Sequence, residues 1–342
     1  MNPLMSKFER IDENSRLPKY RQVINTILEE INQELFKPGD RIPSINETSE
    51  EYYLSRDTVE KAYRELSQRG VISSIPGKGY YVNGNAEVAK VRVMIIFDKL
   101  TDHQKVIFNS FAKSLGKRAC INLHVHHSDF KCFEELILDN IGNYDYYVIM
   151  PHFYDYREEV EAVLKKIPRN KLLVLDRQIK DMDGSFSCIY QDFAKDLEGA
   201  LFSGLDLLKK YRKLFLVYPQ HIKYPPEIRV GFRNFCHDAN IDYELIPSVS
   251  GHSPRKGEAY IVLEESDLIE LVKKCQKSRL ELGKDLGIVS YNDTPLKEVV
   301  GNGITVISTD PITMGQVAAD MIIHKKRDSA KNPFYLLRRN SL

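Results

Sequence analysis

Residues 40–82 read DRIPSINETSEEYYLSRDTVEKAYRELSQRGVISSIPGKGYYV, and this stretch decides the fold of the N-terminal part of the chain. Ser44 stands three residues before Glu47, which is the offset of a capping box, so the spacing predicts that a helix begins there. Ser55 is the predicted N-cap of the next helix, and Gly70 occupies the place of a C-terminal glycine that ends it. Apolar residues at helical spacing predict the buried face of this second helix: Val59, Ala62, Tyr63 and Leu66.

The segments on either side complete this small unit. Upstream, LPKYRQVINTILEEINQEL predicts an amphipathic helix. Its apolar stripe consists of Tyr20, Val23, Ile24, Ile27, Leu28, Ile31 and Leu35. Downstream, VISSIPGKGYYV predicts two short strands joined by a Gly-Lys-Gly turn. Three helices followed by a hairpin predict a winged helix-turn-helix domain over residues 1–82.

The composition limits the function classes that need to be considered. The 342 residues are enough for two domains, and 49 basic against 48 acidic side chains leave no global field that would announce a nucleic-acid partner. The N-terminus lacks the apolar region of a signal peptide, and no run of about 18 apolar residues occurs, so we expect a cytoplasmic protein with no membrane partner. The odd number of cysteines argues against a disulfide framework and predicts small core residues: Cys120, Cys132, Cys188, Cys236 and Cys275.

The remainder of the chain has a different character. After NGNAEVAK, a polar stretch that predicts a linker over residues 83–90, strand-like apolar runs alternate with amphipathic segments. The runs are VRVMIIF, YDYYVIM, NKLLVLD, KLFLVY, AYIVLE and LGIVSY, and the longest amphipathic segments are DFAKDLEGALFSGLDLLKKY and DLIELVKKCQKSRLEL. Such alternation predicts an α/β fold with parallel sheets. Because residues 91–342 are too many for one ordinary doubly wound unit, we expect two lobes with a cleft between them.

The position of three polar residues predicts contact with DNA. In a helix-turn-helix the leading turn of the second helix reaches base edges, and Arg56, Asp57 and Thr58 fall at that turn. Arg56 suits a guanine or a phosphate, and Thr58 suits a phosphate or a thymine methyl group. Further backbone contacts are predicted for Arg41, Lys61, Arg64, Arg69 and Lys78. For Arg64 and Arg69, ordinary solvated helix charges are an equally good interpretation.

The segment from Arg41 to Val82 resembles the winged-helix DNA-binding domain of the GntR family of bacterial repressors. That family's pattern runs Leu-Pro-Ser, then Ser-Arg-x-Thr-Val, then a glycine-rich wing. The resemblance implies that Ser44, Ser55, Arg56 and Thr58 contact DNA in or beside the major groove, and that Gly77, Lys78 and Gly79 lie in the minor groove. Many members carry arginine where this chain has Asn46 and Glu60, so a base preference is not carried over.

Three fragments of the larger segment resemble the sugar-binding domain of LacI-type repressors and periplasmic sugar-binding proteins. They are LLVLDRQI at 172–179, LGIVSYNDTPL at 286–296 and ITVISTDPITMGQVAADMI at 304–322. A GntR-type head on such a body is similar to the arabinose repressor group of sugar-catabolism regulators. The fold implied is two Rossmann-like lobes hinged around a ligand.

Polar residues that follow apolar strands are the candidate effector ligands, because open parallel sheets bind ligands at the carboxyl ends of their strands. The residues in such places are Asp98, His152, Asp176, Tyr218 and Asn292, and by the resemblance Asp176 and Asn292 match ligand-contacting positions best. We add Arg177 and Arg229, the second because relatives place an arginine near the glycine of the GF pair, where this chain has Ile228 and then Arg229. A structural ion pair between Asp176 and Arg177 is the alternative.

The chemistry of the effector is left open by these residues. A free pentose or 6-deoxyhexose, such as arabinose or fucose, needs hydroxyl partners, whereas a phosphorylated sugar could use Arg177, Arg229 or Arg233. Two histidines of NLHVHH, His124 and His126, are expected on one strand face, but the spacing supplies no further metal ligands, so no metal is predicted.

Enzymatic activity is not expected. Neither a phosphate-binding loop nor a nucleophile elbow is present in the sequence. Some GntR-type heads are fused to aminotransferase-like bodies that use pyridoxal phosphate, but those bodies are larger than about 250 residues and carry a lysine motif. A binding module without regulatory output is the other alternative. We therefore predict a repressor without a cofactor, acting as a homodimer on operator DNA and released by a sugar or sugar phosphate.

Overall fold

The computed structural model describes residues 11–12, 17–83, 90–153, 157–179, 186–220 and 224–342. The predicted linker, apart from its two end residues, lies outside them. Among the described residues no helix combines the length and the apolar character that crossing a membrane requires.

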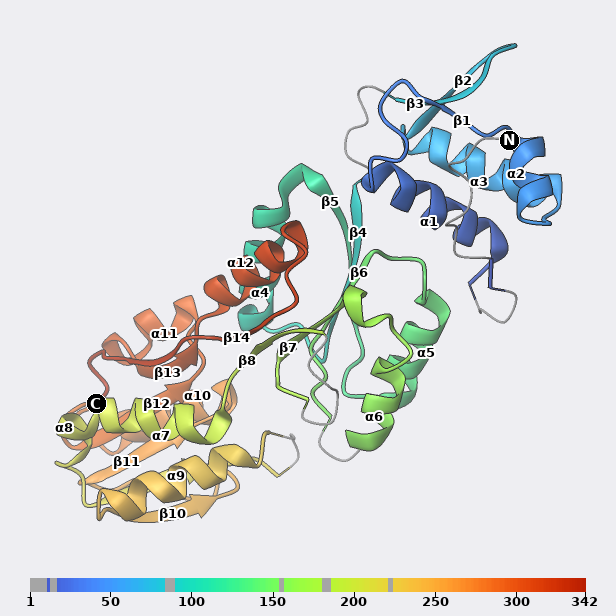
Figure 1. Cartoon of the computed structure of the whole chain (residues 1–342). Helices are drawn as coiled ribbons and strands as arrows, with labels where there is room; N and C mark the ends of the chain where they lie inside the picture. The colour runs from blue at the N-terminus through green and yellow to red at the C-terminus, as the bar shows by residue number, and fades with distance from the viewer. Residues whose placement is uncertain (1–10, 13–16, 84–89, 154–156, 180–185, 221–223) are drawn as a thin grey trace. The chain divides into compact units, whose positions relative to one another are not determined.

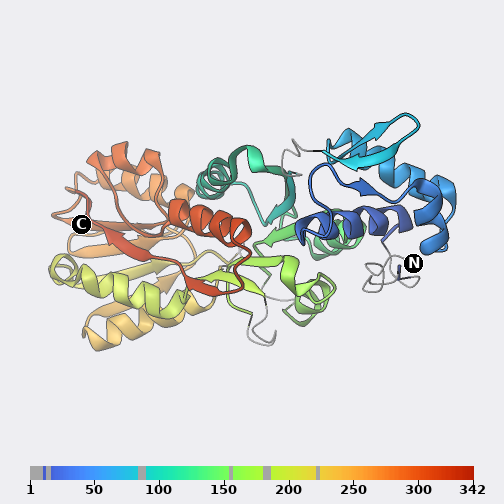
Figure 2. The ribbon, with the colours of Figure 1, turned by 45° about the horizontal axis from the view of Figure 1, so that its top comes forward.

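The N-terminal domain has the predicted three helices and a wing (Figures 1 and 2). The elements are α1 (Lys19–Asn32), β1 (Arg41–Ile42), α2 (Ile45–Glu51), α3 (Arg56–Gln68), β2 (Ile72–Ile75) and β3 (Gly79–Val82). Strand β1 was not predicted, because two residues carry no periodicity. It exists through antiparallel pairing with β3, with Arg41 opposite Tyr81, and the sheet order is β1-β3-β2.

Side-chain caps set where α2 and α3 begin. The hydroxyl of Ser44 accepts from the Glu47 amide at 3.2 Å, and the Ser44 amide donates to the Glu47 carboxylate at 2.6 Å, so the predicted capping box is confirmed. Ser55 caps α3, and Gly70 follows that helix with a φ of +69°. The prediction for Leu35 is wrong: α1 ends before it, and its side chain is 53% exposed.

A buried tyrosine ties the two helices of the helix-turn-helix together. Tyr63 of α3 donates its hydroxyl hydrogen to the carbonyl of Pro43 at 2.7 Å, and its oxygen lies 2.8 Å from the hydroxyl of Thr48 in α2. Tyr63 is 1% exposed and, with the three other predicted apolar residues of α3, belongs to the core of this domain. This packing fixes α3 relative to α2 and leaves the first turn of α3 at the surface.

The first of two larger sheets has the strand order β14-β8-β7-β6-β4-β5. Its strands are β4 (Val91–Phe97), β5 (Ala119–Val125), β6 (Tyr146–Ile149), β7 (Leu172–Asp176), β8 (Ser187–Tyr190) and β14 (Ser329–Lys331). The helical elements of this part are α4 (Asp102–Leu115), η1 (Gly116–Arg118), α5 (Phe130–Asn140), α6 (Arg157–Leu164), η2 (Arg169–Lys171) and α12 (Pro311–Ile323). Helix α12 packs closely on α4, because a Cβ at Gly315 would lie 2.5 Å from the carbonyl oxygen of Ile107.

The second sheet has the order β10-β9-β11-β12-β13-β15, parallel except for β15, which pairs antiparallel with β13. Its strands are β9 (Lys213–Val217), β10 (Asp242–Ile246), β11 (Glu258–Val262), β12 (Leu286–Tyr291), β13 (Thr305–Thr309) and β15 (Phe334–Leu337). Its helical elements are α7 (Phe193–Ser203), α8 (Leu205–Leu208), α9 (Glu227–Asp238), α10 (Glu265–Lys277), α11 (Pro295–Val299) and η3 (Val300–Asn302). Apolar clusters cover both faces. The α/β fold with a winged helix-turn-helix and two Rossmann-like lobes is therefore confirmed.

Two expectations about the body need correction. The segment 192–211 forms two helices that meet at Gly204, where a Cβ would lie 2.8 Å from a methyl carbon of Leu336. Three of the five cysteines are buried as predicted, but Cys120 is exposed and Cys132 is half-buried. Cys120 lies on β5, one of the two edge strands of the first sheet, and occupies one of its outward positions.

Candidate DNA-binding surface and effector site

The first turn of α3 presents an exposed cation beside two paired hydroxyls. The Ser55 hydroxyl accepts from the Thr58 amide at 3.3 Å and lies 2.8 Å from the Thr58 hydroxyl. Arg56 and Asp57 are exposed. Because the helix N-terminus adds partial positive charge, this turn attracts anions as well as base edges.

The wing and strand β1 bring a second pair of predicted residues together. Gly77 and Gly79 have φ values of +75° and +107°, a region that glycine adopts readily, and they leave Lys78 exposed at the tip. A Cβ at Gly79 would lie 3.1 Å from Nε of Arg41, so the guanidinium of Arg41 packs directly on the wing. The predicted contacts Arg41, Lys78 and Gly79 therefore share one surface.

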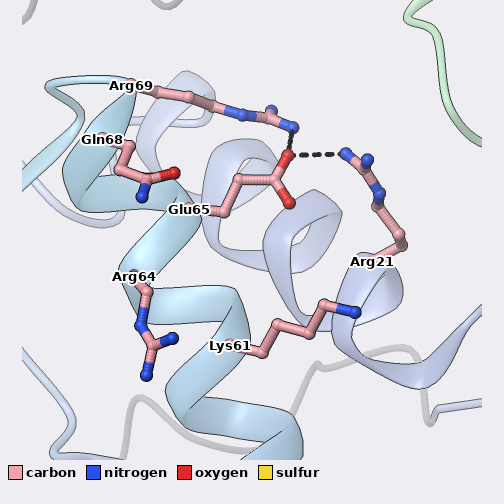
Figure 3. Close-up of a pocket in the computed structure, with 6 residues that line it drawn as sticks. All are labelled: Arg21, Lys61, Arg64, Glu65, Gln68 and Arg69. Atoms are coloured by element: carbon pink, nitrogen blue, oxygen red, sulfur yellow. Dashed lines mark hydrogen bonds and ion pairs between the residues drawn. The ribbon is translucent and has the colours of Figure 1, made fainter.

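Lys61 belongs to a different part of this domain. It lines a depression of about 510 Å³ together with Arg21, Arg64, Glu65, Gln68 and Arg69 (Figure 3). The carboxylate of Glu65 lies 2.6 Å from the Arg21 guanidinium and also pairs with Arg69. Since Lys61 comes five residues after Arg56, it points roughly 140° away from Arg56 around the helix axis. The structure therefore separates these two predicted DNA contacts.

Three predicted effector residues meet at the carboxyl edge of the first sheet. The Nε2 atom of His152 lies 2.8 Å from Oδ2 of Asp176, and its Nδ1 atom lies 3.4 Å from Oδ2 of Asp98. A fourth residue, Gln191, donates its amide nitrogen to the other oxygen of Asp176. These side chains follow or end β4, β6, β7 and β8, which are neighbours in the sheet, so parallel strand ends bring them together. We call Asp98, His152, Asp176 and Gln191 the carboxylate cluster.

The charges of the carboxylate cluster follow from its geometry. Burial by itself lowers the pKa of His152, but the carboxylates of Asp98 and Asp176 outweigh it and raise that pKa to about 10. Burial opposes ionisation of Asp98, yet the adjacent His152 holds its pKa below the usual value. The cluster therefore contains two carboxylates and one imidazolium near neutral pH.

Sequence reasoning missed residues around this cluster. Gln191 is the first polar residue after the run SCIY, so the rule that identified Asp98 would also have found it. His126, which was expected on a strand face with His124, follows β5 instead, because that strand ends at Val125. It is buried, stacks on Phe153 with ring centroids 4.5 Å apart, and has a pKa lowered to about 4 by burial. His103, in the first turn of α4, also has a pKa lowered to about 4 by burial, and no sequence signal marked it. No cluster of metal-ligating side chains occurs in the part of the chain that the structure describes.

The remaining predicted effector residues lie on the second sheet or join the two sheets. Arg177 follows β7 and pairs with Glu227 of α9 at 3.5 Å. Tyr218 follows β9, and the guanidinium of Arg229 lies over its ring, 5.0 Å from the centroid. Asn292 follows β12 and belongs to a separate polar network.

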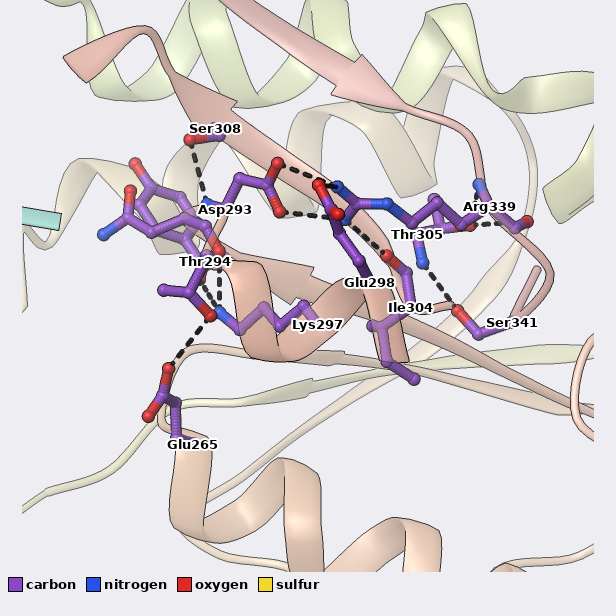
Figure 4. A network of polar contacts seen from close by, with 12 residues as sticks. Glu265, Asp293, Thr294, Lys297, Glu298, Ile304, Thr305, Ser308, Arg339 and Ser341 are labelled. Atoms are coloured by element: carbon purple, nitrogen blue, oxygen red, sulfur yellow. Dashed lines mark hydrogen bonds and ion pairs between the residues drawn. The ribbon is translucent and has the colours of Figure 1, made fainter. Parts of the chain in front are cut away.

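That network holds the turn after β12 (Figure 4). Asn292 has a φ of +60°, and Nζ of Lys297 donates to the carbonyls of Tyr291 and Asn292 at 2.8 and 2.6 Å. Lys297 is 2% exposed, and burial lowers its pKa to about 8. Arg339 makes two hydrogen bonds to the carboxylate of Asp293, at 2.8 and 2.9 Å. These bonds fix the backbone of Asn292 on both sides.

Comparisons with known proteins agree with this architecture. Residues 19–82 match the model for bacterial regulatory proteins of the gntR family, and residues 207–337 match a periplasmic binding protein-like domain. The chain is 37% identical over 82 residues to the HTH-type transcriptional repressor YtrA of Bacillus subtilis, which is 24% of this chain and 63% of that protein. It is 39% identical over 67 residues to the arabinose metabolism transcriptional repressor of Geobacillus stearothermophilus, 20% of this chain and 18% of that protein.

The solved structures show the fold of the body. A dimeric Lac repressor with an 11-residue C-terminal deletion superposes with a TM-score of 0.59 at 17% identity, covering 73% of this chain and 98% of that one. A transcription regulator-like protein from Staphylococcus haemolyticus gives a TM-score of 0.59 at 17% identity, covering 74% and 98%. The chain thus spans less than two thirds of the curated relatives named above, but nearly all of these structures.

Proposed function

We propose that this chain, whose winged-helix domain belongs to the GntR family and is joined to a LacI-type, periplasmic-binding-protein-like body, is a transcriptional repressor controlled by a small molecule. The observation that carries the proposal is the first turn of α3. It holds Arg56 at the surface next to the hydroxyls of Ser55 and Thr58, on a helix that Tyr63 anchors to α2.

In the proposed complex this turn enters the major groove and the wing contacts the minor groove. Arg56 reads a base or a neighbouring phosphate, and Ser44, Ser55 and Thr58 position the helix on the backbone. Gly77, Lys78 and Gly79 contact the minor groove, and Arg41, which packs on Gly79, contacts the adjacent backbone. Lys61 adds long-range attraction. Because the proposed partner is operator DNA, we expect the protein to act in the cytoplasm.

The effector is proposed to bind at the carboxyl edges of the two sheets. Asp98, His152, Asp176 and Arg177 follow or end strands of the first sheet and form one side, and Tyr218, Arg229 and Asn292 are assigned to the other. A sugar effector and carbohydrate-catabolism genes are supported by the arabinose repressor among the relatives and by the Lac repressor fold. Effector binding is proposed to release the operator, as a coupling free energy between two sites.

The DNA-binding unit is proposed to be a homodimer. One winged helix covers a single half-site, so two heads held by paired bodies are needed to read a pseudo-palindrome. Sedimentation of the full chain at micromolar concentration should show a dimer, and a monomer would contradict this part of the proposal.

The DNA-binding proposal is tested by selecting duplexes from a random library with the full-length protein. Arg56→Ala should weaken binding to the selected sequence by about 1 to 3 kcal/mol, which is about 5- to 150-fold. Lys78→Ala should weaken binding to all sequences alike. It should also reduce the slope of the logarithm of the affinity against the logarithm of the salt concentration by about one. The control is Lys284→Ala, an exposed residue of the body that pairs with Glu281. Failure to enrich any sequence, or unchanged affinity of Arg56→Ala, would overturn the assignment.

A further inference from the structure

Two oxygen atoms of the carboxylate cluster have no hydrogen-bond partner among the residues that the structure describes. They are Oδ1 of Asp98 and Oε1 of Gln191, and the two residues are only 5% and 6% exposed. A buried acceptor without a donor costs about 1 to 3 kcal/mol. The cluster is therefore deficient in donors, although it is a fixed part of the sheet edge.

The orientation of the Gln191 amide is settled by its partner. An ionised carboxylate can only accept, so the nitrogen of Gln191 must face Asp176 and the oxygen must face away from it. On the opposite side of the cluster, Oδ2 of Asp98 is next to His152, which leaves Oδ1 as the second acceptor. Both available positions thus accept hydrogen bonds.

The charges beside these acceptors restrict what can donate to them. Two carboxylates surround one imidazolium, so the cluster carries a net charge of −1 near neutral pH. The cations of the proposed effector site already have partners: Arg177 pairs with Glu227 at 3.5 Å, and the guanidinium of Arg229 lies 5.0 Å from the ring centroid of Tyr218. Lys99, next to Asp98, lies 5.4 Å from the ring centroid of Tyr224. A phosphate ester carries a charge of about −1.5 to −2, and its oxygens are mainly hydrogen-bond acceptors. Next to the acceptor oxygens and the negative charge of the cluster, a phosphate group would therefore be repelled. An ammonium group would donate, but it would lie next to the cation His152.

We infer that the effector is an uncharged polyhydroxyl compound, a sugar or polyol, whose hydroxyl groups donate to Asp98 Oδ1 and Gln191 Oε1, and that phosphate esters are rejected at this site. The inference rests on the proposed function, because it takes the carboxylate cluster as part of the effector site. It makes Gln191 a specificity-determining residue. Both oxygens are covered in this structure, so the surrounding side chains move when a ligand enters.

The test is calorimetry on the full-length protein with matched pairs of compounds. The neutral members are D-glucose, D-fructose, D-ribose, L-arabinose and mannitol, and the charged members are glucose 6-phosphate, fructose 6-phosphate, ribose 5-phosphate, arabinose 5-phosphate and mannitol 1-phosphate, with inorganic phosphate alone. At least one neutral compound should bind, and it should bind about 10-fold or more tightly than its phosphate ester. Tighter binding of an ester or of inorganic phosphate, or binding of no neutral compound, overturns the inference.

Two variants connect the result to the two acceptors. Gln191→Leu should weaken binding of the neutral compound by about 5- to 150-fold, because one buried hydroxyl of the ligand loses its hydrogen-bond partner. Gln276→Leu, at an exposed position on α10, is the control and should bind as the wild type does. If Gln191→Leu does not fold, Asp98→Asn replaces it. Because this substitution removes one negative charge, the ratio of the affinity for the neutral compound to the affinity for its phosphate ester should decrease. Unchanged binding in the folded variant overturns the inference, whereas failure of the DNA selection would count against the proposed function instead.

Discussion

Replacing His152 with glutamine should destabilise the body in a strongly pH-dependent way. The imidazolium lies between two buried carboxylates at 2.8 and 3.4 Å, and removing one member of a buried ion pair costs about 3 to 5 kcal/mol. The pKa of His152 is about 10 in the folded protein, against an ordinary value of 6.5. This difference gives an upper value of about 5 kcal/mol for the contribution of the protonated His152 to the unfolding free energy.

The sign of the pH dependence follows from the raised pKa. The folded protein binds the proton of His152 more tightly than the unfolded chain does, so the stabilisation is complete below pH 6.5 and is lost as the pH rises toward 10. The difference in unfolding free energy between wild type and His152→Gln should therefore be about 3 to 5 kcal/mol at pH 6. It should fall to about 1 kcal/mol at pH 9.5.

The assay is guanidinium unfolding followed by circular dichroism, since the chain contains no tryptophan. His237→Gln is the matched control, because His237 is an exposed histidine that pairs with Asp238 at 3.0 Å. It should change the unfolding free energy by less than about 0.5 kcal/mol at either pH. A difference for His152→Gln below about 1 kcal/mol at pH 6, or one that is equal at both pH values, would refute this view of the carboxylate cluster.

Three further predictions concern single residues. Burial, followed by the charge of Glu51, raises the pKa of Glu30 to about 7. Glu30→Gln should therefore stabilise the head by up to about 3 kcal/mol at pH 8 and by about 1 kcal/mol at pH 5. A melting temperature that this substitution raises equally at both pH values would contradict this. Gly79→Ala should destabilise the wing more than Gly77→Ala in limited proteolysis, because both φ values are positive but only a Cβ at Gly79 meets Arg41; equal effects would argue against that contact. Burial lowers the pKa of Lys297 to about 8. In unfolding titrations the wild type should therefore gain stability relative to Lys297→Met as the pH rises from 8 to 10.5. A constant difference in unfolding free energy between the two proteins over this pH range would contradict this.

Local signals in the sequence predicted much of this structure. The caps of α2 and α3 depend on residues three positions apart, and the apolar runs are long enough to be identified as strands. The rule that polar residues follow strands found Asp98, His152 and Asp176. It could not show that His152 lies between the two aspartates, because that depends on β6 lying between β4 and β7 in the sheet.

Features that arise from pairing between distant segments were not predictable in the same way. Strand β1 has two residues and is defined by its partner β3. Cys120 looks like a core residue in the sequence, yet it lies on an edge strand whose outward positions face solvent. The separation of Lys61 from Arg56 is different, because it follows from helix geometry alone and the predicted bounds of α3 were sufficient to derive it.

In the proposed mechanism, a small molecule at the sheet edges controls DNA binding by the head. The most direct test is the affinity of the full-length protein for its selected duplex at one fixed salt concentration, with and without a neutral sugar that binds in calorimetry. We predict that the sugar weakens operator binding by about 1 to 3 kcal/mol, or about 5- to 150-fold, and that the operator weakens sugar binding by the same factor. Equal operator affinities with and without the sugar would rule out this coupling between the two sites.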